Sequence, residues 1–354
     1  MQSERQRKNA EVQEPHSVRP PSLRYFFSLM STSLAVTSAC EQPDAFVSML
    51  IIGHADRSSL LRINVGCLLN ALAFSSDGDY LVNGTTAGVQ VWRVEDGKQM
   101  ATIAASYVRC IAVSKDGNWI AAGTYFGEVF LCDAATPYNK VLALEGISDI
   151  YDVNFSPDSS RLVTTASANS TAFIWDVAAR VHVTALHHDD MLVAKYSPHG
   201  DRLATANHES VRIYDSDGYR LLVDIPINVS FGFLWLEAYL FVSSDNKIKQ
   251  IEASTGSEVS EWLVPGTNGS GRIALPTHRE FMAYSRDCTI TFWDPWTHTQ
   301  LGLIQHTQDV SSIAVSPDGR FLAIGEECGK VTIKRLSHIT VSFVFLSCGV
   351  SKQI

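Results

Sequence analysis

The densest cluster of potential metal ligands in the sequence is formed by His187, His188, Asp189 and Asp190. Imidazole nitrogens and carboxylate oxygens can together bind a divalent metal ion. The same four side chains can also belong to a solvated loop or to a buried structural network. We expect a structural role for this cluster and assign no metal ligand, and a metal or binding role stays open as the alternative.

Sequence motifs of the common catalytic sites are absent from the chain. There is no Gly-x-Ser-x-Gly nucleophile turn, no His-Glu-x-x-His zinc motif and no Gly-x-x-x-x-Gly-Lys-Ser/Thr phosphate loop. We therefore expect no catalytic residue and no cofactor, and we expect the protein not to be an enzyme.

Composition and charge narrow the class of protein further. The 354 residues are 45% hydrophobic and 18% charged, which is enough apolar material for a large core. The net charge of −9 repels a phosphate backbone, so direct binding of nucleic acid is not expected. The seven cysteines are scattered without a Cys-x-x-Cys pair, as in an intracellular protein whose thiols stay reduced.

Residues 1–45 differ in character from the rest of the chain. Residues 25–40 carry no charge but are interrupted by serine and threonine, so they form neither a good signal-peptide core nor a membrane span of roughly 18 apolar residues. We expect a disordered leader here, with a targeting role as the alternative. The protein is then cytoplasmic or nuclear, with no membrane partner.

A turn of the type Ser-Pro-Asp-Gly recurs along the chain at a nearly constant interval. Its copies begin at Ser75, Ser114, Ser156, Ser197 and Ser316, with two weaker copies at Leu234 and Leu275. The steps are 39, 42, 41, 37, 41 and 41 residues, close to the period of about 40 of a repeat built from four strands. In such a turn proline presets φ, aspartate bonds its own backbone and glycine takes the left-handed position.

A second landmark keeps the same phase as the turns. It lies 17 to 19 residues after each start, at Trp92, Cys132, Trp175, Tyr214, Ile251, Trp293 and Arg335. Short alternating or β-branched runs separate the two landmarks, and helical periodicity is absent. The chain is therefore predicted to be all-β.

The repeats resemble those of the WD-repeat family over roughly residues 58–336. Trp175 with Asp176 and Trp293 with Asp294 form the dipeptide that names the family, and residues 306–310 resemble the usual entry into a repeat. The resemblance implies one seven-bladed β-propeller of four-stranded antiparallel blades. We place it at residues 46–336, between the leader and a tail of uncertain structure at residues 337–354.

The repeats depart from the buried His, Ser/Thr, Asp and Trp network that the resemblance implies. The third repeat has Ile147 in place of histidine but keeps Thr165, Asn169 and Trp175. The seventh keeps His306 but has Lys334 in place of tryptophan. Apolar packing between neighbouring blades must therefore supply most of the stability. On the same resemblance, the cluster at residues 187–190 coincides with the place of the structural histidine and aspartate.

The last blade lacks an outer strand unless another segment supplies it. Residues 59–65 match the outer-strand segments of other repeats and are predicted to pair with the last blade and close the ring. Residues 339–346 also form a strand-like run and compete for that place. Residues 46–52 are a further apolar run without an assigned role.

The resemblance places the usual contact surface on the face where loops enter the blades. Loop positions on rigid scaffolds often bind partners, and tyrosine and arginine are frequent in binding hot spots. The candidate binding residues are Tyr107, Arg109, Tyr125, Phe126, Asp149, Tyr151, Asp190 and Arg286. Four of them belong to the second and third repeats, which are neighbours in a ring, so we expect their loops to lie side by side: Tyr107, Arg109, Tyr125 and Tyr151.

The function that these observations favour is a non-catalytic protein–protein interaction scaffold or adaptor in a macromolecular complex, with other proteins as partners. The alternative is a propeller hydrolase or lactonase that uses carboxylates of the central channel or a metal. The partner's identity, the pathway and the oligomeric state do not follow from the sequence.

Overall fold

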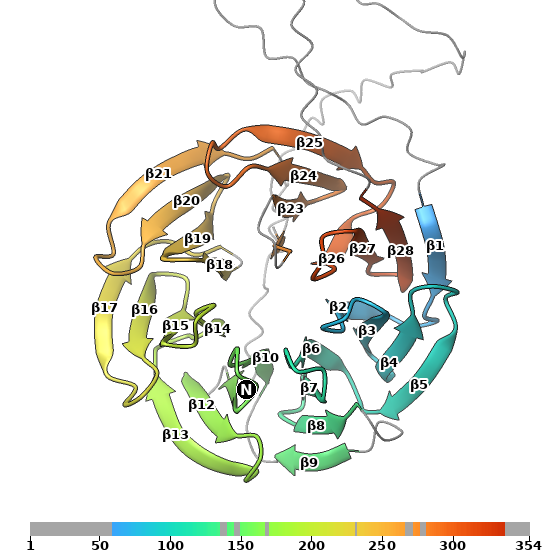
Figure 1. Cartoon of the computed structure of the whole chain (residues 1–354), viewed down its shortest axis with the longest axis horizontal. Coiled ribbons are helices and arrows are strands. Elements are labelled where there is room, and N and C mark those ends of the chain that lie inside the picture. The colour runs from blue at the N-terminus through green and yellow to red at the C-terminus, as the bar shows by residue number, and fades with distance from the viewer. Residues whose placement is uncertain are drawn as a thin grey trace, which may run out of the picture. The chain divides into compact units, whose positions relative to one another are not determined.

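The computed structural model describes residues 59–134, 140–144, 149–166, 170–230, 232–265, 272–276 and 281–336. These residues form 28 strands, which pair into seven four-stranded antiparallel sheets arranged as the blades of a propeller (Figure 1). The predicted all-β, seven-bladed architecture is confirmed. None of the described residues belongs to a helix that could span a lipid bilayer.

Each blade runs from an innermost to an outermost strand. Blade 1 contains β2 (Leu69–Phe74), β3 (Tyr80–Thr85), β4 (Gly88–Arg93) and β5 (Gln99–Ala104), and blade 2 contains β6 (Val108–Val113), β7 (Trp119–Thr124), β8 (Val129–Asp133) and β9 (Lys140–Leu144). Blade 3 contains β10 (Ile150–Phe155), β11 (Arg161–Ala166), β12 (Thr171–Asp176) and β13 (Val181–His187), and blade 4 contains β14 (Val193–Tyr196), β15 (Arg202–Ala206), β16 (Ser210–Asp215) and β17 (Leu221–Pro226). Blade 5 contains β18 (Gly232–Leu236), β19 (Tyr239–Ser244), β20 (Lys247–Glu252) and β21 (Glu258–Leu263), and blade 6 contains β22 (Arg272–Ala274), β23 (Met282–Arg286), β24 (Thr289–Trp293) and β25 (Gln300–Gln305). Blade 7 contains β26 (Val310–Val315), β27 (Phe321–Glu326), β28 (Lys330–Arg335) and β1 (Ser59–Asn64).

The recurring serine turns connect the first two strands of blades 1, 2, 3, 4 and 7. In blade 3, the Ser156 hydroxyl donates to the Asp158 carboxylate at 2.5 Å and accepts the Arg161 amide at 2.9 Å. The hydroxyl of Ser156 and the donors at Ser160 lower the pKa of Asp158 below its usual value. These bonds satisfy the turn locally, so its aspartate is structural.

The ring is closed by the start of the described chain. β1 runs antiparallel to β28 with Ile63 opposite Val331, and the Val65 amide donates to the Gly329 carbonyl at 2.8 Å (Figure 1). The predicted closure by residues 59–65 is therefore confirmed, and it pairs the outer edge of blade 7. The competing segment, residues 339–346, and the apolar run at residues 46–52 lie outside the described residues.

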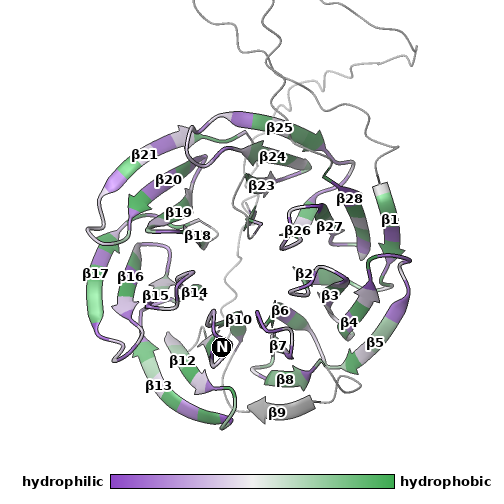
Figure 2. Ribbon diagram, in the orientation of Figure 1, coloured by the Kyte–Doolittle hydropathy of each residue, from purple (hydrophilic) through white to green (hydrophobic). Residues whose placement is uncertain are grey.

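The core lies between neighbouring blades. Leu69 and Leu81 of blade 1 pack with Ala323 and Val331 of blade 7, and similar apolar clusters join other neighbours. The outermost strands, such as β5 and β21, mix hydrophilic and hydrophobic residues (Figure 2). The blades are so close that a Cβ built at Gly123 of blade 2 would lie 2.4 Å from Cγ2 of Ile150 of blade 3.

Blade 3 forms only part of the buried His, Ser/Thr, Asp and Trp network that the resemblance implies. The Trp175 indole of blade 3 donates to Thr164 at 3.1 Å, so the assignment of Thr165 as its partner was wrong. Successive residues of a strand face opposite ways, and Thr165 donates instead to the Leu192 carbonyl at 3.3 Å. The expected Asn169 and Ile147 of this repeat lie outside the described residues.

The cluster of histidines and aspartates ahead of blade 4 separates into a buried and an exposed part. His188 is 1% exposed, and its ring nitrogens lie 2.8 Å from Thr205 Oγ1 and 2.9 Å from Ser210 Oγ. Burial lowers its pKa to about 4. His187 is exposed and contacts Asp189. His188 is thus part of the blade, and no group of three possible metal ligands occurs among the residues that the structure describes.

Candidate binding face

The predicted binding residues lie at the same end of the blades. In an antiparallel blade, the loop that enters the first strand and the turn between the second and third strands are at one end. We call the surface made by these loops and turns the loop face. Tyr107 precedes β6, Tyr125 and Phe126 lie between β7 and β8, and Asp190 precedes β14.

Five of the eight residues come together on blades 2 and 3. The Arg109 guanidinium carbon lies 3.4 Å from the centroid of the Tyr151 ring and 4.6 Å from that of Tyr125. Beside them, the rings of Tyr107 and Phe126 meet edge to face with centroids 5.4 Å apart. Cation–π attraction and this edge contact hold the side chains in place. We call these five residues the aromatic–arginine cluster.

Local backbone features position the cluster. The pairing of β6 with β7 shifts register between Val108 and Cys110, and that of β10 with β11 shifts between Ile150 and Asp152. Such β-bulges re-aim a side chain, here Arg109 and Tyr151 respectively. Tyr107 adopts a φ of 53°, which is uncommon for an aromatic residue and is often found at functional sites.

Backbone hydrogen bonds secure the loop that carries Tyr107. Its amide donates to the Thr86 carbonyl of blade 1, and its carbonyl accepts the amide of Tyr125, each at 3.0 Å. The loop is therefore tied to both neighbouring turns. The cluster presents aromatic side chains to solvent from a firm support, with Tyr107, Tyr125 and Phe126 exposed by 49%, 41% and 69%.

The other three predicted residues do not join the cluster. Asp149 is half-buried directly before β10, and Asp190 is exposed in the loop before β14. Arg286 differs from the expected exposed position, because it is 5% exposed. Its guanidinium donates to the Asp245 carbonyl at 3.1 Å and to Asn246 Oδ1 at 2.6 Å, which links blade 6 to blade 5.

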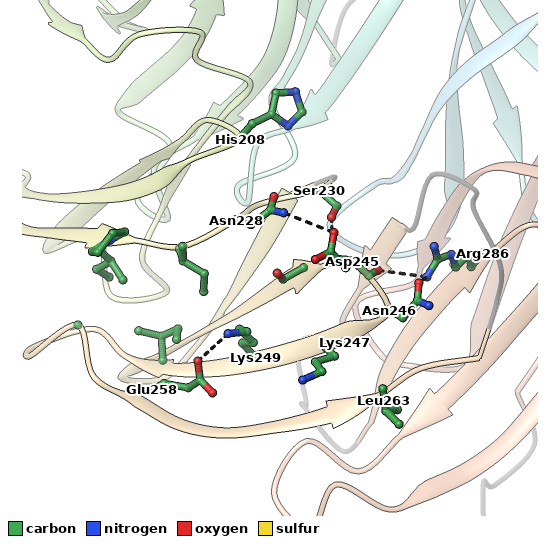
Figure 3. Close-up of a pocket in the computed structure, with 16 residues that line it drawn as sticks. His208, Asn228, Ser230, Asp245, Asn246, Lys247, Lys249, Glu258, Leu263 and Arg286 are labelled. Carbon is green, nitrogen blue, oxygen red and sulfur yellow. Dashed lines mark hydrogen bonds and ion pairs between the residues drawn. The ribbon is translucent and has the colours of Figure 1, made fainter.

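A groove that sequence reasoning missed runs between blades 4 and 5, from Asp245 on the loop face to Gly256 in the turn at the other end of blade 5 (Figure 3). Its volume is about 1070 Å³. The Asn228 amide donates to the Asp245 carboxylate at 3.4 Å, and Lys249 pairs with Glu258 at 2.8 Å. The charges on the walls of the groove therefore partly neutralise one another. No short motif could have revealed this groove, because its walls come from strands of adjacent blades.

A second cavity, of about 460 Å³, lies in the central channel, lined by residues of the innermost strands. It shares His208 and Ser230 with the groove, and Arg109 and Tyr151 with the aromatic–arginine cluster. The channel thus connects the two features of the loop face.

Three charged residues of the channel wall were also missed, namely Asp152, Lys195 and Arg272. Burial raises the pKa of Asp152 to about 6, while Lys195 opposes that shift. A signal for two of them was present, because Asp152 and Lys195 interrupt the apolar runs of innermost strands. Charged residues at such positions can be accommodated where they face a channel.

Comparison with known proteins identifies the repeats. The family model "WD domain, G-beta repeat" matches residues 97–126, 139–176 and 298–333. Each matched segment contains the outermost strand of one blade and continues into the next blade.

Named relatives carry the same repeat or align with most of the ring. The chain is 40% identical over 85 residues to WD repeat-containing protein 1 of Gallus gallus, covering 23% of this chain and 14% of that protein. It is 23% identical over 307 residues to Protein groucho of Drosophila melanogaster, covering 82% and 42%. It is 26% identical over 161 residues to a subunit of Chromatin assembly factor 1 of Mus musculus, covering 44% and 25%. The chain thus spans less than half the length of each of these relatives.

The three matched segments, their phase along the chain and the ring of seven four-stranded blades lead to one assignment: the chain carries WD repeats, and its described residues form a seven-bladed β-propeller.

Proposed function

We propose that this propeller is a non-catalytic protein-interaction scaffold that binds its partner through the aromatic–arginine cluster. The observation that carries the proposal is the position of Arg109 between the rings of Tyr151 and Tyr125, beside the exposed Tyr107 and Phe126. Tyrosine and arginine in a fixed arrangement are typical hot-spot residues.

The rigidity of the cluster supports this role. Association requires interface side chains to lose rotamer freedom, at a cost of about 0.5 to 1.5 kcal/mol for each side chain that becomes immobilised. Ring contacts and backbone bonds already restrain Arg109 and Tyr107 in the free protein. A partner therefore meets a preorganised surface, which lowers that cost.

The relatives support a role in assemblies. One of them belongs by name to a chromatin assembly factor of more than one subunit. Together with the net charge of −9, this favours protein partners over direct contact with nucleic acid, in the cytoplasm or the nucleus.

The test compares how much partner co-purifies with the wild type and with variants substituted at opposite ends of the blades. Replacing Tyr107 and Phe126 together with alanine should reduce partner recovery at least tenfold, because hot-spot truncations typically cost about 2 kcal/mol or more. Trp296→Ala is the matched control, since Trp296 is 45% exposed and lies between β24 and β25, at the other end of blade 6. Equal recovery with both variants and the wild type would refute the proposed surface.

The hydrolase or lactonase alternative has one specific candidate residue. Asp152 is the carboxylate among the described residues that line the channel, and its pKa of about 6 suits proton transfer near neutral pH. Hydrolysis of an ester or lactone substrate that is lost in Asp152→Asn would favour this alternative over the scaffold.

A further inference from the structure

The central channel carries an excess of positive charge in an otherwise acidic chain. Arg109 of β6, Lys195 of β14 and Arg272 of β22 line it from alternate blades. The carboxylate of Asp152 is the single negative charge among the described lining residues. The whole chain has a net charge of −9, so this concentration of cations runs against the overall charge.

These three cations are not neutralised in the way that other cations of the propeller are. Arg161 lies 2.5 Å from Asp176, and Lys247 lies 2.5 Å from Glu261. Among the described residues, by contrast, no ion pair is formed by Arg109, Lys195 or Arg272. Arg272 donates to a neutral acceptor, the Ser311 carbonyl, at 3.4 Å.

The channel cations also act on one another. Desolvation in the ring lowers the pKa of Arg272, the charge of Asp152 opposes that shift, and the charge of Arg109 lowers the pKa further. The guanidinium groups of Arg109 and Arg272 therefore repel each other in the channel. An additional negative group in the channel would relieve that repulsion.

We infer that the channel binds an anionic side chain, a carboxylate or a phosphoryl group, on a peptide segment of the partner that docks on the aromatic–arginine cluster. This inference rests on the proposed function and names the chemistry of the partner. Arg109 belongs to both features, because its planar face stacks on Tyr151 while it lines the channel. A stacked guanidinium keeps its N–H edge available for an oxyanion.

The space fits such a ligand. The channel volume of about 460 Å³ falls within the roughly 300 to 1,000 Å³ of typical ligand sites. The exposed rings of Tyr107, Tyr125 and Phe126 stand next to Arg109, where they can contact residues that flank the anionic one. The expected partner segment is therefore an acidic or phosphorylated residue flanked by apolar residues.

The experiment measures binding of the full chain to short peptide libraries with random flanks and a fixed central residue. The central residue is glutamate, glutamine, lysine, serine or phosphoserine. We expect glutamate to bind about tenfold more tightly than glutamine, and lysine to bind most weakly. If phosphoserine binds more tightly than glutamate, the anion is a phosphoryl group, and if the two are equal a carboxylate is sufficient.

Charge-reversal variants test whether the preference for a glutamate peptide arises in the channel. Lys195→Glu and Arg272→Glu should each reduce binding of the glutamate library about tenfold or more, and the neutral variants Lys195→Gln and Arg272→Gln should reduce it less. Lys115→Glu is the matched control, because Lys115 is exposed in the turn between β6 and β7, at the end of the blade away from the loop face. Circular dichroism checks that each variant folds.

Two results would overturn the inference. One is equal binding of the glutamate and glutamine libraries, and the other is an unchanged preference in the charge-reversal variants. If Phe126→Ala still abolished binding of all libraries, the proposed contact surface would stand and only the channel site would fall. If Phe126→Ala left peptide binding intact while charge reversal removed it, the channel site would stand and the proposed surface would fall.

Discussion

Replacing Gly123 with alanine tests how closely neighbouring blades must approach. The added Cβ would lie 2.4 Å from Ile150 Cγ2 and 2.8 Å from Cys110 Sγ, and both partners are buried. Overpacking of this kind typically costs about 1 to 3 kcal/mol, because side chains or backbone must shift. We therefore expect Gly123→Ala to lower the free energy of unfolding by about 2 kcal/mol.

Urea denaturation followed by tryptophan fluorescence measures this loss as a shift of the midpoint at constant slope. Gly218→Ala is the matched control, since its nearest atom within 4 Å is Asp215 Oδ1, at an ordinary contact distance of 3.5 Å. That variant should be neutral or stabilising by less than about 1 kcal/mol, because alanine restricts the unfolded chain.

A second substitution separates crowding from other effects of the added methyl group. Ile150→Ala removes the crowded Cγ2 and alone should cost about 2 to 5 kcal/mol. In that background the closest contact of the Gly123→Ala methyl group is gone, while Cys110 Sγ and the Cβ at position 150 still lie 2.8 Å from it, so its cost should fall without vanishing. Equal costs of Gly123→Ala in both backgrounds, or a cost no larger than that of Gly218→Ala, would refute the role of close blade contact.

Three further predictions address closure, the leader and pH. Deleting residues 59–65 should destabilise the protein far more than deleting residues 337–354, because only the former remove β1 from blade 7; aggregation of the tail deletion alone would contradict this. Deleting residues 1–45 should leave the thermal midpoint within a few degrees, and a collapse of the midpoint would show that they support the fold. The folded state holds the pKa of His188 at about 4, below the unfolded value of about 6.5, so the stability it contributes is complete above pH 6.5 and is lost as pH falls towards 4. From about pH 7 to pH 4.5, the free energy of unfolding should fall less in His188→Gln than in the wild type, by on the order of 2 kcal/mol. Parallel pH curves of the two proteins would refute this prediction.

Features fixed by local chemistry could be predicted from the sequence. The serine turns and their period located the seven blades, because each turn satisfies its own hydrogen bonds, as Ser156 and Asp158 do. The closing strand was predicted because residues 59–65 resemble other outer strands. The approach of Arg109 to Tyr125 and Tyr151 was anticipated because adjacent repeats are neighbours in a ring.

Features that depend on register or on distant blades could not be predicted. Periodicity alone does not show that β-bulges re-aim Arg109 and Tyr151, or that Thr164 rather than Thr165 reaches Trp175. Lys195 and Arg272 are far apart in the sequence, and only the closed ring brings them to one channel. The burial of Arg286 accompanies its bonds to the preceding blade, which a loop assignment cannot foresee.

Site-specific photo-crosslinking tests most directly whether the aromatic–arginine cluster is the partner-binding surface. A photoreactive phenylalanine analogue replaces Phe126 in one sample and Trp296 in the other, two exposed aromatic positions at opposite ends of their blades. We expect protein adducts from position 126 that disappear when Tyr107 and Tyr125 are also replaced with alanine, and few adducts from position 296. Adducts from position 296 alone, or adducts from position 126 that persist without the two tyrosines, would contradict this expectation.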